Sequence, residues 1–173
     1  MDTNQPHSSI ELLCRRFGAQ HFQTGQHVGM DAVIVPKSIL AEVMRFLHDD
    51  EHCCYEQLTD LIGIDYLGYP QRETRFGLVY LLLSVRHNRR LAVKVLLEEP
   101  DLSVPTLTNI YSGANWPERE AAEMFGFSFV DHPDPRRLLL SDLFEGVHPL
   151  RKDYPLTGRG ERNGFKVVGR DTA

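Results

Sequence analysis

Apolar residues recur at helical spacing in two segments of the N-terminal part of the chain. In the first, Ile10, Leu13 and Phe17 share one helical face, which predicts a short helix that Gly18 ends. The run Ser8-Ser9-Ile10-Glu11 in front of it resembles a capping box. A second helix is predicted over residues 38–49, capped by Ser38, with an apolar face formed by Ile39, Val43, Phe46 and Leu47.

Other segments have the apolar runs and alternation of strands. Residues 22–28 and 31–35 predict two strands, and residues 76–85 and 91–97 predict the two clearest ones, joined by a turn at residues 86–89. In the last strand every second residue is apolar, so one face is expected to be well buried and the other partly buried, as in an antiparallel pair. Residues 58–66 are ambiguous, and a strand is expected in their second half: Leu58-Thr59-Asp60-Leu61-Ile62-Gly63-Ile64-Asp65-Tyr66.

Two more helices are predicted before residue 130. One is a short helix over residues 105–111, after a proline-bearing loop. The other begins at Asn115, which stands three residues before Glu118 at capping-box spacing. In this helix Arg119 is expected to pair with Glu123, and Gly126 is expected to end it. The order of elements predicts an α+β domain over residues 1–130, with a largely antiparallel or mixed sheet packed with helices.

Periodicity ends at about residue 131, and an extended, proline-containing C-terminal arm is predicted over residues 131–173. Its prolines each remove a backbone donor and fix φ. Irregular backbone with directed charges needs partners for its polar groups, and we expect another protein to supply them. Arginine forks pairing with carboxylates, within the chain or across an interface, are the preferred interpretation of the charges. The features concerned are Pro133, Pro135, Pro149 and Pro155 and the basic pairs Arg136-Arg137 and Arg151-Lys152, near Asp134 and Asp153.

The composition of the chain argues against several classes of protein. The chain has 173 residues and a net charge of −5. Residues 131–173 hold eight Lys and Arg against seven Asp and Glu, so the arm is near neutral and the body is acidic. This balance argues against nucleic-acid binding, which would need a dominant basic face. No apolar run approaches the roughly 20 residues of a membrane-spanning helix, and no secretory signal or transit peptide is expected.

Candidate catalytic chemistry is sparse. Glu118, Glu120 and Glu123 could act as an acid–base or metal set, but capping, the helix dipole and salt bridges to nearby arginines are the preferred explanation. His132 and His148 could begin a metal site, although structural hydrogen bonding in a loop is preferred. The three cysteines, Cys14, Cys53 and Cys54, form no CxxC pair and indicate a reducing compartment. No glycine-rich phosphate loop accompanies the arginines.

Two stretches together carry a family resemblance. They contain Asn115, Trp116, Glu118, Arg119, Glu120, Met124, Phe125, Gly126, His132, Pro133, Asp134, Arg136, Arg137, Leu138 and Leu139, and the run His148-Pro149-Leu150-Arg151-Lys152-Asp153-Tyr154-Pro155-Leu156. In this order they closely resemble the C subunit of respiratory complex I, which is the 30 kDa subunit family of the proton-translocating NADH–quinone oxidoreductase. The resemblance covers about residues 10–160.

The resemblance implies a non-catalytic peripheral-arm subunit of that translocase, which carries no cofactor of its own. Such a subunit stabilises the D subunit, which together with the B subunit forms the quinone pocket, and it has the I subunit as a further neighbour. Iron–sulfur clusters, FMN and quinone are then held by partner subunits. The expected location is the cytoplasmic side of the bacterial inner membrane, with membrane association only through the complex.

Two other functions remain open at this point. The first is the equivalent subunit of a ferredoxin-dependent NDH-1-type complex or of a membrane-bound nickel–iron hydrogenase, because the groups that distinguish these complexes lie in partner subunits. The second is a small metal-dependent enzyme that uses His132, His148 and nearby carboxylates.

The chain also departs from the family pattern at several positions. Ala122 is small where a large residue is common, and Val147 looks like an extra residue before His148. The chain ends soon after Lys166-Val167-Val168, without the longer tail of many members. These departures bear on the local geometry near residues 122–135 and 147. The remaining ones are Glu123 where Asp is usual, Asp131 where Gly is usual and Pro135 where Leu is usual.

Overall fold

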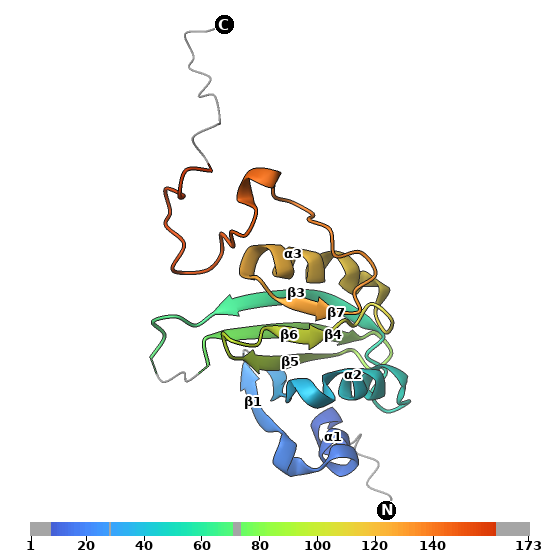
Figure 1. Ribbon diagram of the computed structural model, residues 1–173. Coiled ribbons are helices and arrows are strands. Elements are labelled where there is room, and N and C mark those ends of the chain that lie inside the picture. Colours follow the sequence, from blue (N-terminus) through green and yellow to red (C-terminus); the bar gives the residue numbers. More distant parts are fainter. Residues whose placement is uncertain (1–7, 28, 71–73, 162–173) are drawn as a thin grey trace, which may run out of the picture.

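A five-stranded sheet organises the chain in the computed structural model, which describes residues 8–27, 29–70 and 74–161 (Figure 1). Three α-helices and a two-stranded sheet accompany it. The α-helices are α1 (Ser9–Phe17), α2 (Leu40–Asp49) and α3 (Asn115–Phe125). The strands are β1 (Gln23–His27), β2 (Met30–Ile34), β3 (Gln57–Asp65), β4 (Phe76–Ser84), β5 (Arg89–Leu97), β6 (Ser103–Pro105) and β7 (Ser128–Val130). Short 3-10 helices are η1 (Ala19–His21), η2 (Lys37–Ile39), η3 (Ser112–Ala114) and η4 (Asp142–Phe144).

The large sheet has the strand order β1-β2-β5-β4-β3. Strands β2 and β5 are parallel, and the other neighbours are antiparallel. The predicted α+β class with a mixed sheet is therefore confirmed. The β4–β5 hairpin is also confirmed, and Asn88 in its turn has φ +49°, a left-handed conformation that Asn tolerates better than most residues.

The two faces of the large sheet differ in their cover. One face of β4, formed by Phe76, Leu78, Tyr80 and Leu82, is at most 1% exposed. It packs in a cluster to which all three α-helices contribute, among others through Leu13, Leu40 and Ala121. The side chains between these on β4 and β5 point to the opposite face, because successive strand residues alternate. Their small apolar cluster contains only strand residues: Ala32, Val79 and Ala92, with Met30, Ile64 and Leu81 packed against them.

The predicted helices α1 and α2 are confirmed, but their predicted caps are wrong. Ser8 precedes α1 without a side-chain hydrogen bond to it. Ser38 lies inside η2, and Ile39 is the residue before α2. Gly18 does end α1, with φ +93° and its N–H donated to the carbonyl of Cys14. The spacing of a capping box is a local sequence signal. At the start of both helices the backbone conformation differs from that of a capped helix, and the hydroxyls of Ser8 and Ser38 make no capping hydrogen bond.

The predicted helix over residues 105–111 is wrong. Pro105 belongs to β6, which pairs in parallel with β7, a strand that the sequence did not indicate. Residues 107–111 make a single turn, in which the N–H groups of Ile110 and Tyr111 both donate to the carbonyl of Leu107. One turn fixes several dihedral angles for few hydrogen bonds, so it does not propagate into a helix without further support.

Two predicted strands need comment on their boundaries, β3 and the first strand. β3 spans all of Gln57–Asp65 rather than the second half of that segment. Its register against β4 shifts between Leu58 and Asp60, and this irregularity obscures the alternation in the sequence. The predicted first strand ended at Val28, which lies outside the described residues, as do residues 162–173 of the predicted arm, including Lys166-Val167-Val168.

Candidate functional site along helix α3

Helix α3 packs beside the edge strand β3, and the segment after β7 passes over the helix (Figure 1). The residues singled out in the sequence come from these two stretches. The structure brings them together as one connected cluster, in which the helix supplies carbonyls and charged side chains and residues 131–153 supply their partners.

Glu118 is the most deeply buried charged residue of the cluster, at 0% exposure. It does not cap its own helix, because its carboxylate accepts hydrogen bonds from the Thr106 hydroxyl (2.5 Å) and the Leu107 N–H (2.7 Å). His132 Nε2 lies 3.8 Å from the same carboxylate. Burial raises the pKa of Glu118, and the hydrogen bonds and His132 offset this only in part. The predicted capping role of Asn115 and Glu118 is therefore wrong.

Arg119 joins the helix to the start of the arm. Its guanidinium donates to the backbone carbonyls of Arg136 and Arg137, both at 2.8 Å, and forms an ion pair with Asp134 at 3.2 Å. The predicted Arg119–Glu123 pair is not formed. Glu123 instead accepts the backbone N–H groups of Leu138, Leu139 and Leu140 at 2.8–3.3 Å. A carboxylate that gathers three amides fixes an irregular turn that has no backbone partners of its own.

The C-terminal end of α3 is completed by the motif that begins at His148. The last four carbonyls of a helix have no partner inside it. Gly126 donates its N–H to Ala122, and the three following carbonyls are bound by His148 Nδ1 (2.9 Å), the Leu150 N–H (3.2 Å) and Arg151 Nε (2.6 Å). The positive charge of Arg151 also lies where the helix dipole is negative. The two motif stretches are thus a helix and its external cap.

Gly126 permits this approach. It ends the helix with φ +83°, in the left-handed region. A Cβ at this position would lie 2.5 Å from Arg151 Nη2 and 2.7 Å from His148 Nε2. Glycine therefore satisfies the backbone conformation and leaves room for the capping side chains.

A second anchor holds residues 152–153 at the end of β3. Asp65, 4% exposed, accepts hydrogen bonds from Arg75 (3.1 and 3.2 Å), from the Lys152 N–H (2.9 Å) and from the Leu67 N–H (2.9 Å). Arg75 also pairs with Asp153 at 2.8 Å. Burial alone would raise the pKa of Asp65, but the hydrogen bonds from Arg75, Lys152 and Leu67 together hold it below its ordinary value.

Acidification should weaken this anchor. A carboxylate whose pKa is lowered in the folded state contributes stability above its ordinary pKa of 3.8, and this is lost as the pH falls through the folded value. We expect Asp65→Asn to lower the free energy of unfolding at pH 7 by about 2 kcal/mol. The gap between the two proteins should shrink toward pH 3. Urea unfolding of both across this range measures it, and a gap that stays constant or widens would contradict the assignment.

The two histidines are held in place by hydrogen bonds to the backbone. His132 Nδ1 accepts the Asp134 N–H at 3.0 Å, so its Nε2 carries the proton and donates to the carbonyl of Asn115 at 3.1 Å. His148 donates through Nδ1 to the carbonyl of Glu123. Within the described ranges no three His, Cys, Asp or Glu side chains gather around a common point. The contacts of both rings are those of structural groups.

The remaining predicted site residues lie at the edges of the cluster. Arg136 is exposed and paired with Asp134, Arg137 donates to the carbonyls of Ser141 and Phe144, and Tyr154 lies half-buried under Arg159. Phe125 is buried against Phe127. Glu120 and Leu150 line a small groove between α3 and β3, and Pro133 is exposed whereas Pro149 is half-buried.

Sequence reasoning missed Asp65, Arg75 and Thr106. Asp65 and Arg75 lie ten residues apart at the ends of paired strands, and only the β3–β4 register brings them together. An acidic residue at the end of an apolar strand was the one available signal for Asp65. Thr106 carried none, because it stood in the segment predicted as a helix.

The structure explains two of the departures from the family pattern by their local surroundings. Asp131 has φ +63°, a conformation that suits glycine and that Asp tolerates. Ala122 lines two cavities, of about 180 and 200 Å³, between α3 and the arm, where its small side chain leaves space. Pro135 lines both, and Val147 lines the second.

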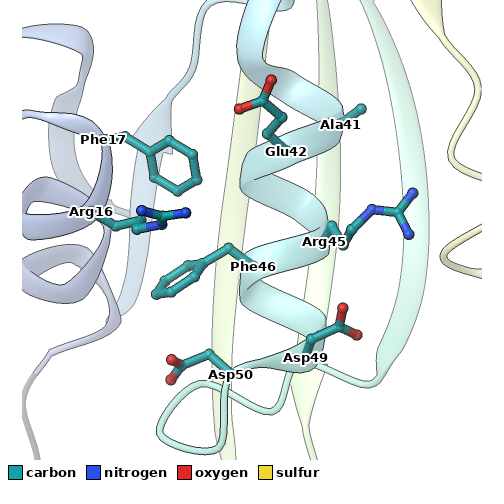
Figure 2. A pocket seen from close by; sticks show the side chains of 8 residues that line it. All are labelled: Arg16, Phe17, Ala41, Glu42, Arg45, Phe46, Asp49 and Asp50. Carbon is teal, nitrogen blue, oxygen red and sulfur yellow. The ribbon is translucent and has the colours of Figure 1, made fainter.

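A further hollow lies away from this cluster. It is open, has a volume of about 590 Å³, and lies between α1 and α2, where it is lined by Phe17, Phe46, Arg16, Glu42, Arg45 and Asp49, among others (Figure 2). The two rings pack edge to face at 5.8 Å. None of the predicted site residues lines it, and its charges are of both signs. Among residues 8–27, 29–70 and 74–161, none of the helices has the length and hydropathy of a membrane-spanning segment.

Comparison with known proteins gives consistent matches. The family described as respiratory-chain NADH dehydrogenase, 30 Kd subunit, matches residues 33–160. The NADH-quinone oxidoreductase C subunit of Rhodospirillum rubrum is 50% identical over 129 residues, which cover 75% of this chain and 58% of the relative. The C subunit of Paramagnetospirillum magneticum is 48% identical over 127 residues, covering 73% and 61%. The chain thus spans about six tenths of the length of these relatives.

Two solved structures share the fold. The trypsin-resistant fragment (1-134) of Nqo5 has a TM-score of 0.64 and 31% identity, covering 73% of this chain and 99% of the fragment. A chain of the membrane-bound sulfane sulfur reductase, an archaeal respiratory membrane complex, has a TM-score of 0.73 and covers 93% of this chain and 91% of its own. Because the two sequences are only 20% identical, this likeness is evidence of a common fold and of nothing further.

Proposed function

This chain belongs to the 30 kDa subunit family of respiratory-chain NADH dehydrogenases, and we propose that it is a non-catalytic peripheral-arm subunit of an NADH–quinone oxidoreductase. In this role it stabilises the quinone-site subunits rather than carrying electrons. Its relatives, which are named as C subunits of that enzyme, support the type of complex. The partners in this proposal are the D subunit, with the B and I subunits nearby, and iron–sulfur clusters, FMN and quinone are held by partner subunits.

The outer surface of the arm is the observation that carries the proposal. Residues 132–153 are fastened to α3 and Asp65 by their inward-facing polar groups. The arm also leaves large apolar side chains in solvent, from 54% to 89% exposed: Leu139, Leu143, Leu150 and Leu156. Several exposed leucines on one pinned, irregular segment are more typical of a protein interface than of free surface.

Fixing the arm on α3 before association favours binding. An arm that is ordered before association loses less conformational entropy when the partner binds. In this proposal the function of the cluster along α3 is to hold the exposed leucines in place for the D subunit. In this proposal the buried charges of the cluster hold the arm and take no part in chemistry.

The location follows from the proposed complex. We place the chain on the cytoplasmic side of the bacterial inner membrane, attached to the membrane only through its partners. The equivalent subunit of a ferredoxin-dependent complex or of a nickel–iron hydrogenase shares this architecture. The relatives at about 50% identity, all named as subunits of NADH-quinone oxidoreductase, favour the NADH-dependent complex.

Replacing exposed leucines of the arm should weaken assembly without unfolding the chain. We expect the double variant Leu143→Asp/Leu150→Asp to reduce recovery of this chain with the complex by about tenfold or more, because two anchors of an apolar interface become charged. The measurement is native gel electrophoresis of the complex isolated through the D subunit. The circular dichroism and urea unfolding of the isolated variant should stay close to those of the unaltered chain.

Val85→Asp is the matched control. Val85 is 64% exposed in the turn that follows β4, so an exposed apolar residue is replaced by Asp outside the arm. This variant should assemble normally. Normal assembly of the double leucine variant, or equal loss in the control, would exclude the arm as the docking surface.

A further inference from the structure

The face of the large sheet that points away from the α-helices is mainly apolar. Its cluster of Ala32, Val79 and Ala92 includes no helix residue. Around this floor stand larger apolar side chains that are only partly buried: Met30, Ile34, Ile64, Leu81, Leu83 and Leu96, with Ile62 at 40% exposure. A mainly antiparallel sheet can leave one face in solvent, but such a face usually carries polar side chains, whereas this one is mainly apolar. We name this surface the open sheet face.

Two alanines lie side by side on the middle strands of the open sheet face. Ala32 of β2 and Ala92 of β5 lie opposite each other in the parallel register, and Ala92 faces Leu81 across β4 and β5. Small residues thus lie along the middle of the sheet, between larger ones on the flanking positions. Such a floor allows the backbone of a covering element to approach closely, as helices do when they pack on a sheet.

Charge gives the face its second feature. Lys94 lies on the central strand β5, between Ile34 of β2 and Val79 of β4. It is half-buried and makes no side-chain hydrogen bond or ion pair with any residue that the structure describes. Arg90, exposed on the same side of β5, is likewise unpaired among these residues. The acidic side chain of this face, Asp60, stands on the edge strand β3.

We propose that the open sheet face is a second interface of this chain and that an amphipathic helix of a partner subunit covers it, with a Glu or Asp of that helix paired to Lys94. The apolar side of the helix packs on the alanine floor. Its carboxylate satisfies a cation that would otherwise lose water without compensation. This interface meets the arm only at its β3 edge, where Asp60 and Ile62 line the same groove as Leu150. Its centre at Lys94 lies on β5, two strands away from that edge.

A second copy of the chain fits this face less well. In a twofold pairing of two open sheet faces, Lys94 and Arg90 of one copy would approach those of the other. Like charges in an interface cost binding energy, and no acidic residue of the described face stands near its centre to offset them. A partner helix with a carboxylate meets both the shape and the charge.

Lysine footprinting of the assembled complex tests the proposal. The complex is isolated through another subunit and acetylated, and the rates at Lys94 and Lys37 are compared by mass spectrometry with those of the isolated full chain. Lys37 lies at the start of η2 and is 37% exposed. We expect the ratio of the Lys94 rate to the Lys37 rate to fall about tenfold in the complex, because an interface core excludes water. An unchanged ratio would overturn the proposal.

Zero-length crosslinking identifies the occupant. A carbodiimide joins a lysine to a carboxylate in contact with it. We expect an amide between Lys94 Nζ and a Glu or Asp within a helix of a partner subunit. A crosslink within this chain, to a second copy of it or to none would sink the idea.

Variants provide an independent readout. Lys94→Glu should reduce retention in the complex by about tenfold or more, because it places two like charges together. Lys94→Met leaves the partner carboxylate unpaired but adds no like charge, so it should reduce retention less than Lys94→Glu does. Arg45→Glu on α2 reverses a charge on the helix-covered side and should have no effect. Restoration of the Lys94→Glu complex by a Glu→Lys change at the crosslinked partner position would confirm the pair. Equal loss in the Lys94→Glu and Arg45→Glu variants would argue against it.

Discussion

Replacing Glu118 by Ala is expected to lower the free energy of unfolding by about 3 kcal/mol, because it removes a buried acceptor and opens a space in the core. The Leu107 N–H would lose its acceptor in a buried position, and the Thr106 hydroxyl would keep only Thr108. The space would have the size of the lost methylene and carboxyl groups and lie beside His132. Urea unfolding followed by the fluorescence of Trp116, the chain's single tryptophan at the start of α3, measures the change.

Glu118→Gln separates shape from charge. The amide can accept from Leu107 and donate to Thr106, so this variant should keep most of the stability. Because burial raises the pKa of Glu118, the folded chain binds its proton more tightly than the unfolded chain does. The contribution of this group to stability therefore falls as the pH rises from its ordinary pKa of 4.5 through the folded value. The Gln variant should lack this loss. An Ala variant as stable as the Gln variant would show that the contacts contribute little.

Gly126→Ala is expected to destabilise the chain by about 3 kcal/mol, the sum of a left-handed alanine and of displaced capping bonds. The new Cβ would meet Arg151 and His148 at distances well inside van der Waals contact. The carbonyls of Glu123 and Phe125 would then lose their donors. Besides urea unfolding, trypsin cleavage within residues 136–152 should become faster, because this segment would no longer be held on the helix.

Gly113→Ala is the matched control for this prediction. A Cβ at Gly113 meets nothing within 4 Å, and its backbone is not left-handed. The same added methyl group should therefore change stability little. A Gly126→Ala variant that matches this control in both unfolding and proteolysis would contradict the proposed close approach.

Glu118 and Gly126 are residues whose importance was evident in the sequence but whose role was not. The spacing Asn115 to Glu118 is that of a capping box, and the helix is indeed there. The carboxylate is bound instead by Thr106 and Leu107, which lie in a segment that was predicted as a helix. Gly126 was identified as a helix end. The side chains that occupy the space where a Cβ would lie, those of His148 and Arg151, come more than twenty residues later in the sequence.

The arm shows the same division. Prolines and directed charges predicted an irregular segment whose polar groups are bound by something else, and another protein was the expected partner. In the described part, residues 131–161, many of these groups are bound by α3 and by Asp65 of the same chain. Of the two alternatives that the basic pairs left open, pairing with a carboxylate of the same chain accounts for Arg136, which pairs with Asp134. Arg137 and Arg151 instead donate to backbone carbonyls of the same chain. Docking to a partner stays a prediction, now for the leucines on the outer surface.

Sequence alone determined what depends on neighbours along the chain. The alternation of residues 76–97 specifies a hairpin, helical spacing specifies α1 and α2, and Gly18 and Gly126 mark helix ends, because each signal acts within a few residues. Only the tertiary structure decided which carboxylate meets which donor, that β2 and β5 run parallel, and on which face of the sheet no helix among the described residues joins the apolar cluster. Those outcomes depend on groups far apart in sequence, whose distances are set by packing and not by local preference.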